Sequence, residues 1–232
     1  MIAPQALTRA QSARLKAYLA VADPSAPPLP DEPSIAELVA HPLVRAPLLG
    51  ALDCQVPLLM AAGAGMSDLT QLEYGARHLV RSPGLCSHMV AKFGATAVAV
   101  AMLKVPEHAV ELAGSALVLR DLNISTKMLL TACQGDTASA VEVIRRLLHQ
   151  EAVDAAQRAR MAPIAAQPSS LDALRAKLRP GVLHGVPLDL LVRLGFNGQN
   201  LNNLFGITLE QLGPTLGVSN AALAVLGVYE RA

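Results

Sequence analysis

The stretch "GVPLDLLVRLGFNGQNLNNLFGITLEQLGPTLGVSNAALAVLGV" (residues 185–228) repeats its pattern every ten or eleven residues. Each unit begins with a glycine, continues with an apolar residue and a residue that suits a helix start, and has a leucine six residues after the glycine. The glycines are Gly185, Gly195, Gly206 and Gly217, and the leucines are Leu191, Leu201, Leu212 and Leu223. The regular spacing indicates an internal structural repeat.

Within each unit, a helix stop is followed directly by a helix start. Glycine adopts the left-handed conformation that ends a helix, and the apolar residue after it packs back on the last turn. Asn197, Thr208 and Ser219 are then placed to cap the next helix. Thr208 and Gln211 have the spacing of a capping box, and Pro187 suits a first helical position. We predict a stack of two-turn helices with buried leucines, because helices this short are marginal alone.

The composition of the whole chain favours helices. Of its 232 residues 52% are hydrophobic, but only 3% are aromatic and none is Trp. A core of Ala, Leu, Val and Met suits close-packed helices better than β-sandwiches, which use aromatic and β-branched side chains. We therefore expect an all-α fold, in which a helical bundle is followed by the C-terminal stack of short Gly-capped helices.

Two breaks in the helical pattern divide the chain into parts. "DPSAPPLPDEP" (23–33) contains five prolines, and "APIAAQPSS" (162–170) contains two prolines and two serines. Such segments favour extended linkers. We predict four parts: an N-terminal helix with a Pro-rich linker (1–33), a helical bundle (34–161), a second linker (162–170) and a short-helix repeat subdomain (171–232).

Helix-start signals recur through the expected bundle. Ser34 and Glu37 have the spacing of a capping box. The other predicted starts are Ser67, Ser82 with Pro83, Pro106, Ser125 and Asp136. The last of these precedes an amphipathic helix that we expect to extend to about residue 160.

Residues 208–226 resemble the helix-turn-helix motif of DNA-binding proteins, with Gly217 to Ser219 as the turn and Asn220 as the start of the recognition helix. The resemblance implies a DNA-associated transcriptional regulator. Two features depart from the motif, because Pro214 lies inside the first helix and the second helix has no Arg or Lys. Between residues 181 and 230 Arg193 is the only Arg or Lys, against three acidic residues. Since DNA affinity depends on neutralising phosphates, we favour a structural or protein-docking role and expect no nucleic-acid partner.

Other motifs give little support for catalysis or for a cofactor. "AAGAGMSD" (61–68) has Asp68 where a phosphate-binding loop would need a third glycine, and it fits a helix end better. Cys54, Cys86 and Cys133 have no CxxC spacing and suggest reduced thiols in the core of a cytoplasmic protein. The histidines show no metal-binding spacing. We therefore assign no catalytic, cofactor-binding or metal-binding residue and lean against an enzyme.

Two surfaces are candidates for binding a partner. The N-terminal helix has a stripe that includes Leu15, Tyr18 and Leu19, which could dock on this chain or on a partner. The short-helix stack could present further side chains in series, namely Phe196, Asn200 and Phe205.

The leading hypothesis is a non-catalytic scaffold or adaptor in a larger bacterial complex. Its partner would be another protein or a second copy of this chain. No run of apolar residues is long enough to cross a bilayer. The alternatives are the DNA-associated regulator, using residues 208–226, and an unrecognised all-α enzyme whose active site is assembled from distant residues.

Overall fold

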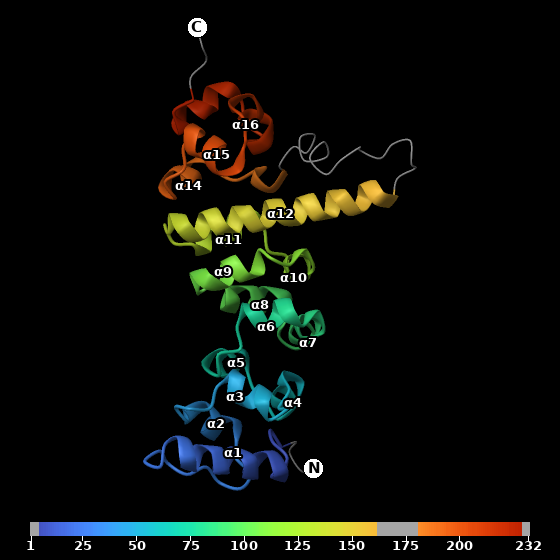
Figure 1. Ribbon diagram of the computed structural model, residues 1–232, viewed down its shortest axis with the longest axis vertical. Coiled ribbons are helices and arrows are strands. Elements are labelled where there is room, and N and C mark those ends of the chain that lie inside the picture. The colour runs from blue at the N-terminus through green and yellow to red at the C-terminus, as the bar shows by residue number, and fades with distance from the viewer. Residues whose placement is uncertain (1–4, 162–180, 229–232) are drawn as a thin grey trace. The chain divides into compact units, whose positions relative to one another are not determined.

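The computed structural model describes residues 5–161 and 181–228, with the backbone alone at residues 159–161. Within these ranges the regular elements are all helices, so the expected all-α class is confirmed (Figure 1). The chain forms two compact units, Met1–Ala101 and Met102–Ala232. This division falls inside the bundle expected at 34–161. The second predicted linker, 162–170, lies outside the described residues.

The first unit consists of one long N-terminal helix followed by short ones. In order they are α1 (Arg9–Ala22), α2 (Ile35–Ala40), α3 (Ala46–Ala51), α4 (Val56–Ala61), α5 (Met66–Gln71), α6 (Ala76–Arg81), α7 (Pro83–Phe93) and α8 (Ala95–Met102), whose last residue belongs to the second unit. The predicted capping box of Ser34 and Glu37 starts α2. Ser67, in contrast, lies inside α5, because Gly65 is the N-cap and its N–H donates to the Asp68 carboxylate at 2.8 Å.

A ten-residue repeat, which we did not predict in this part of the chain, arranges the helices α3 to α6. They begin at residues 46, 56, 66 and 76, and the fourth residue of each is a buried leucine. These leucines are Leu49, Leu59, Leu69 and Leu79. The same spacing of short helices and buried leucines was predicted for the C-terminal stack alone.

The turns between these helices also repeat. Asp53, Gly63 and Glu73 have φ of 56°, 103° and 64°, so a left-handed residue recurs every ten positions. After each of them a backbone N–H donates to the carbonyl oxygen five residues earlier, a helix-ending bond of the Schellman type. The three bonds join Cys54 to Leu49, Ala64 to Leu59 and Tyr74 to Leu69, each at 2.9 Å.

The second unit contains two more series of short helices, separated by one long helix. Its elements are α9 (Pro106–Leu112), α10 (Ala116–Asp121), α11 (Thr126–Ala132), α12 (Thr137–Met161), the 3₁₀-helix η2 (Gly181–Leu183), α14 (Leu188–Arg193), α15 (Gly198–Phe205), α16 (Leu209–Leu216) and the 3₁₀-helix η3 (Asn220–Leu226). The predicted starts at Pro106, Ser125 and Asp136 are confirmed. Helices α9, α10 and α11 again begin ten residues apart, at 106, 116 and 126.

The C-terminal stack follows its sequence pattern closely. The four glycines have positive φ, and Gly206 and Gly217 end α15 and α16 in the left-handed conformation. The four leucines are at most 2% exposed. Thr208 and Gln211 form the predicted capping box. Pro187 is not the first helical residue but the N-cap of α14, because its ψ of 136° is extended.

Candidate interaction surface

The N-terminal helix docks on its own unit, which decides the question that the sequence left open. Leu15 is fully buried and Leu19 is 6% exposed, so neither can contact a partner while the fold is intact. The Gln11 side chain donates from Nε2 to the carbonyl oxygen of Leu52 at 2.9 Å, 41 residues away. Of the three residues predicted on this helix, Tyr18 alone remains available, at 53% exposed.

The Pro-rich segment that follows α1 is not the free tether that its composition predicts. It runs back along the helix, since Asp31 pairs with Lys16 at 2.5 Å and Glu32 pairs with Arg9 at 3.4 Å. Leu29 is buried and anchors its centre. Prolines preclude a helix here but not an extended chain in contact with one. The segment therefore belongs to the first unit.

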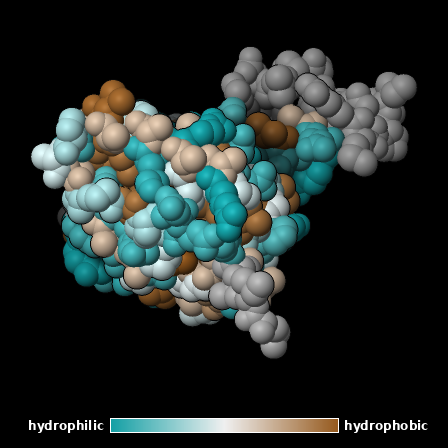
Figure 2. Space-filling model, turned by 90° about the horizontal axis from the view of Figure 1, so that it is seen from below, coloured by the Kyte–Doolittle hydropathy of each residue, from teal (hydrophilic) through white to brown (hydrophobic). Residues whose placement is uncertain are grey.

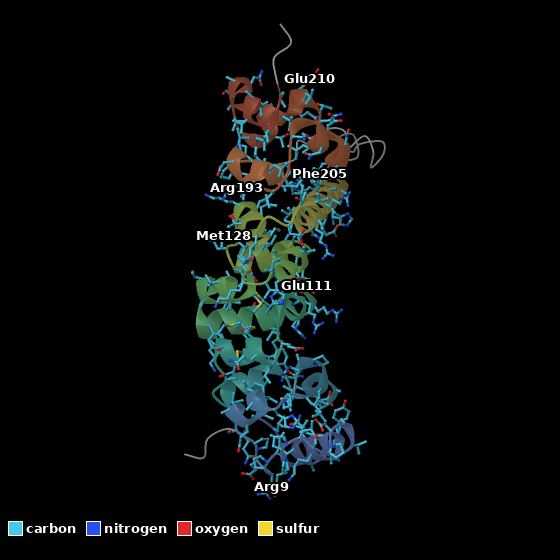
Figure 3. The ribbon with its side chains drawn as sticks, turned by 90° about the vertical axis from the view of Figure 1, so that its left-hand side faces the viewer. Arg9, Glu111, Met128, Arg193, Phe205 and Glu210 are labelled. Atoms are coloured by element: carbon cyan, nitrogen blue, oxygen red, sulfur yellow. The ribbon has the colours of Figure 1, made fainter. Side chains whose placement is uncertain are left out.

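The three predicted binding residues of the C-terminal stack have mainly structural roles. Phe196 is 3% exposed, and its ring centroid lies 6.0 Å from that of the half-buried Phe205 on α15 (Figure 3). Asn200 completes a capping box with Asn197, with backbone-to-side-chain distances of 2.7 and 2.8 Å. Its Nδ2 also donates to the Gly195 carbonyl at 2.8 Å. These contacts hold the repeat together.

The segment that resembles a helix-turn-helix has no recognition α-helix. Residues 220–226 form the 3₁₀-helix η3, in which Leu223 and Leu226 are buried. Pro214 lies inside α16, as the sequence indicates. Arg193, the one Arg or Lys between residues 181 and 228, pairs with Asp189 at 3.6 Å and is exposed on α14 (Figure 3). These features support a packing role for the segment.

An exposed mixed surface lies on the side of α1 opposite its buried stripe. Tyr18 and Val21, three residues apart, are 53% and 84% exposed. Arg14 and Ala17 are also exposed, and their helical spacing places them on the same side. We call Arg14, Ala17, Tyr18 and Val21 the α1 face. Seen from below, hydrophobic residues lie among hydrophilic ones on the molecular surface (Figure 2). The sequence signal for the α1 face was Val21, an apolar residue outside the predicted stripe.

Burial affects the pKa of two cysteine thiols and of one tyrosine. All three cysteines are buried and free of disulfides. Burial raises the pKa of Cys54 and of Cys133 to about 11 in each case. Burial also raises the pKa of Tyr74, whose hydroxyl is buried without a hydrogen-bond partner. At neutral pH these groups therefore remain protonated, whereas a thiol nucleophile needs a lowered pKa.

Neither a metal cluster nor a single membrane-spanning helix is found in the part of the chain that the structure describes. Helices α7 and α8 together reach the length and apolar composition of a span, but the chain bends by 116° between them.

Comparison with protein-family models, with curated proteins and with solved structures gives no match.

Proposed function

We propose that this protein is a non-catalytic scaffold or adaptor that binds another protein through the α1 face. The observation that carries the proposal is the exposure of Tyr18 and Val21 on a helix whose opposite side is firmly docked. Val21 exposes 84% of its surface, so a partner that covered it would remove apolar area from water.

The residue types on the α1 face suit a protein partner. Tyr and Arg are enriched among the residues that dominate binding energy at protein interfaces. Arg14 and Tyr18 are four residues apart on α1, so both can reach one partner. The buried contacts of Leu15 and Leu19 fix the helix before binding, so little ordering of the backbone opposes association.

The repeat architecture is consistent with a scaffold. Stacked short units build an extended surface without requiring a catalytic pocket. Further apolar side chains are exposed on several of the short helices: Leu58, Leu117, Val192, Leu209 and Val225. They are separate along the chain, whereas Tyr18 and Val21 are neighbours on one helix.

The experiment compares the tagged full-length protein with variants in affinity capture from native cells. Tyr18→Ser with Val21→Ser removes the apolar part of the α1 face. Leu58→Ser is the matched control, since Leu58 is 47% exposed on α4 of the same unit. We expect a stoichiometric partner with the wild type and the control, and its loss with the double variant. The three proteins should all remain folded, each variant losing no more than about 1 kcal/mol per changed residue, because the changed side chains are largely exposed.

Two outcomes would contradict the proposal. Wild-type protein that returns alone and remains monomeric by light scattering over the concentrations tested has no partner. A partner that the double variant retains in full binds elsewhere.

A further inference from the structure

The α1 face carries a charge that its own chain leaves unpaired. Helix α1 contains three basic residues, Arg9, Arg14 and Lys16, and no acidic residue. Arg9 pairs with Glu32 and Lys16 pairs with Asp31, both on the Pro-rich segment. The Arg14 guanidinium has no hydrogen bond or ion pair among the residues that the structure describes. Arg14 is therefore the cation of α1 that is free to pair with a partner.

The positions of the three basic residues around the helix explain this difference. Arg9 and Lys16 are seven residues apart, so they lie on the same side of α1, where the Pro-rich segment runs. Lys16 and then Arg9 lower the pKa of the Asp31 carboxyl, so both charges act on this segment. Arg14 is two residues from Lys16, which places it about 160° away around the helix axis. It points away from the carboxylates of its own chain.

The exposed residues around Arg14 have the spacing of two paired helices. Ala10, Arg14, Ala17 and Val21 follow one another at intervals of four, three and four residues, like the a and d positions of a coiled coil. All four are exposed. Ala10 and Ala17 carry only a methyl group, so a second helix can approach α1 closely on either side of Arg14. Tyr18 and Val21 add larger side chains for it to cover.

We propose that the partner of the α1 face is a helix of another protein, with an Asp or Glu opposite Arg14 and apolar side chains opposite Tyr18 and Val21. This inference rests on the proposed function, because it names the partner of the same surface. The planar guanidinium of Arg14 can bind a carboxylate through two parallel hydrogen bonds, so the ion pair fixes the position of the partner helix along α1. The apolar contacts remove surface from water.

The charges of α1 disfavour a second copy of this chain as the partner. The α1 face contains no acidic residue, so two such faces in contact would enclose two Arg14 side chains without a carboxylate. Removing a cation from water without a counter-charge is costly.

The charges also disfavour a nucleic acid or an anionic membrane. Between residues 9 and 33 three basic residues are balanced by three acidic ones. Asp31 and Glu32 lie beside Lys16 and Arg9, so Arg14 is left as the one unpaired cation of α1. Binding to a polyanion uses several cations at once, because each neutralises one phosphate or one lipid headgroup.

The test is zero-length crosslinking of the full-length protein to its captured partner. Arg14→Lys keeps the positive charge and supplies an amine, which a water-soluble carbodiimide joins to a neighbouring carboxylate as an amide. We expect an amide between position 14 and an Asp or Glu of the partner. Mass spectrometry should place apolar residues three or four positions from that carboxylate, the spacing of an amphipathic helix. Lys16 should crosslink to Asp31 in every sample, which verifies the reaction.

Two matched controls accompany this variant. Arg9→Lys places an amine on the other side of α1, and it should crosslink to Glu32 and not to the partner. Arg14→Glu should lower the amount of partner recovered below saturation by about tenfold or more, because it sets two carboxylates against each other. Arg77→Glu, at an exposed arginine on α6 of the same unit, should leave the recovery unchanged.

The outcomes separate this inference from the proposed function. A partner that Tyr18→Ser with Val21→Ser loses, but that forms no amide at position 14, would overturn the acidic helix and leave the proposed function intact. Full recovery of that partner by a folded Arg14→Glu variant would do the same. The crosslinking decides the inference even if Arg14→Glu fails to fold.

Other occupants of the α1 face would also overturn the inference. They would be detected as an amide between position 14 and a second copy of this chain, or as nucleic acid or lipid captured in place of a protein. A crosslinked carboxylate among glycines and prolines would exclude a helix. Wild-type protein that returns alone would contradict both this inference and the proposed function.

Discussion

At the residue scale, the two glycines that end α15 and α16 have the same conformation but different surroundings. Their φ values are 67° at Gly206 and 71° at Gly217. A Cβ atom at Gly206 would meet nothing within 4 Å, whereas one at Gly217 would lie 2.6 Å from Nε2 of His184. Gly206→Ala should therefore lower the free energy of unfolding by about 1 kcal/mol, from backbone strain alone. Gly217→Ala should cost somewhat more in the same urea titration, because the exposed His184 ring must also move aside. Equal losses would show that the His184 ring moves aside freely.

In the first unit, some left-handed positions hold a residue other than glycine, so the reverse change, to glycine, can be made there. Asp53 and Gly63 occupy equivalent turns, with φ of 56° and 103°. Asp53→Gly should raise the free energy of unfolding by about 0.5 to 1 kcal/mol, because a side chain is disfavoured in this conformation. Gly63→Ala should lower it by about the same amount, since its Cβ would have no neighbour within 4 Å. Thermal melting measures both, and a loss of stability in Asp53→Gly would contradict the argument.

The residues at these turns explain why the ten-residue repeat of α3 to α6 was not predicted from the sequence. In the C-terminal stack every left-handed position is a glycine, so the pattern is visible by inspection. In the rest of the chain the equivalent positions include Asp53, Glu73 and Asn123, which carry no such signal. The spacing of Leu49, Leu59, Leu69 and Leu79 was the evidence available instead.

At the element scale, helix α4 contains a pair of adjacent leucines in opposite environments. Leu59 is fully buried and Leu58 is 47% exposed. Leu59→Ala should cost about 2 to 5 kcal/mol of unfolding free energy, because it removes a core side chain and leaves a cavity. Leu58→Ala should cost less than about 1 kcal/mol, since an exposed side chain buries little area. Similar losses at both sites, measured by denaturant unfolding, would show that the helix has a different orientation.

Caps and helix ends were predicted best where a side chain alone determines them. Ser34 with Glu37 and Thr208 with Gln211 form the predicted boxes. The helix start predicted at Ser67 was wrong, because the Asp68 carboxylate accepts the N–H of Gly65 and α5 begins earlier. The docking of α1 could not be predicted, since a stripe of apolar residues has the same sequence pattern whether it packs on its own chain or on another.

At the scale of the whole molecule, the buried thiols should make stability depend on alkaline pH. Cys54 lies in the first unit and Cys133 in the second, and burial raises each pKa from 9.0 to about 11. Below pH 9 the thiols are protonated in both folded and unfolded chains. Between pH 9 and 11 they ionise in the unfolded chain first, so stability falls as the pH rises, by about 2 to 3 kcal/mol for each thiol.

Melting temperatures between pH 8 and 11 measure this effect. The double variant Cys54→Ala with Cys133→Ala should show a shallower decline than the wild type. Some decline should remain above pH 10, because burial also raises the pKa of Tyr74. Identical slopes for the variant and the wild type would show that the thiols ionise equally in both states.

The ten-residue spacing also has a consequence for the order of folding. Helices three places apart contact each other, α2 with α5 and α4 with α7, and the cost of closing a loop grows with its length. The bonds that fix α1 join residues much farther apart, since Gln11 reaches Leu52 and Cys54 Sγ reaches the carbonyl of Ala6. Contacts at long sequence separation form late, because they carry a larger loop entropy. We therefore expect the helices from α2 to α7 to associate first, so that α1 and its Pro-rich segment dock only in the last stage of folding.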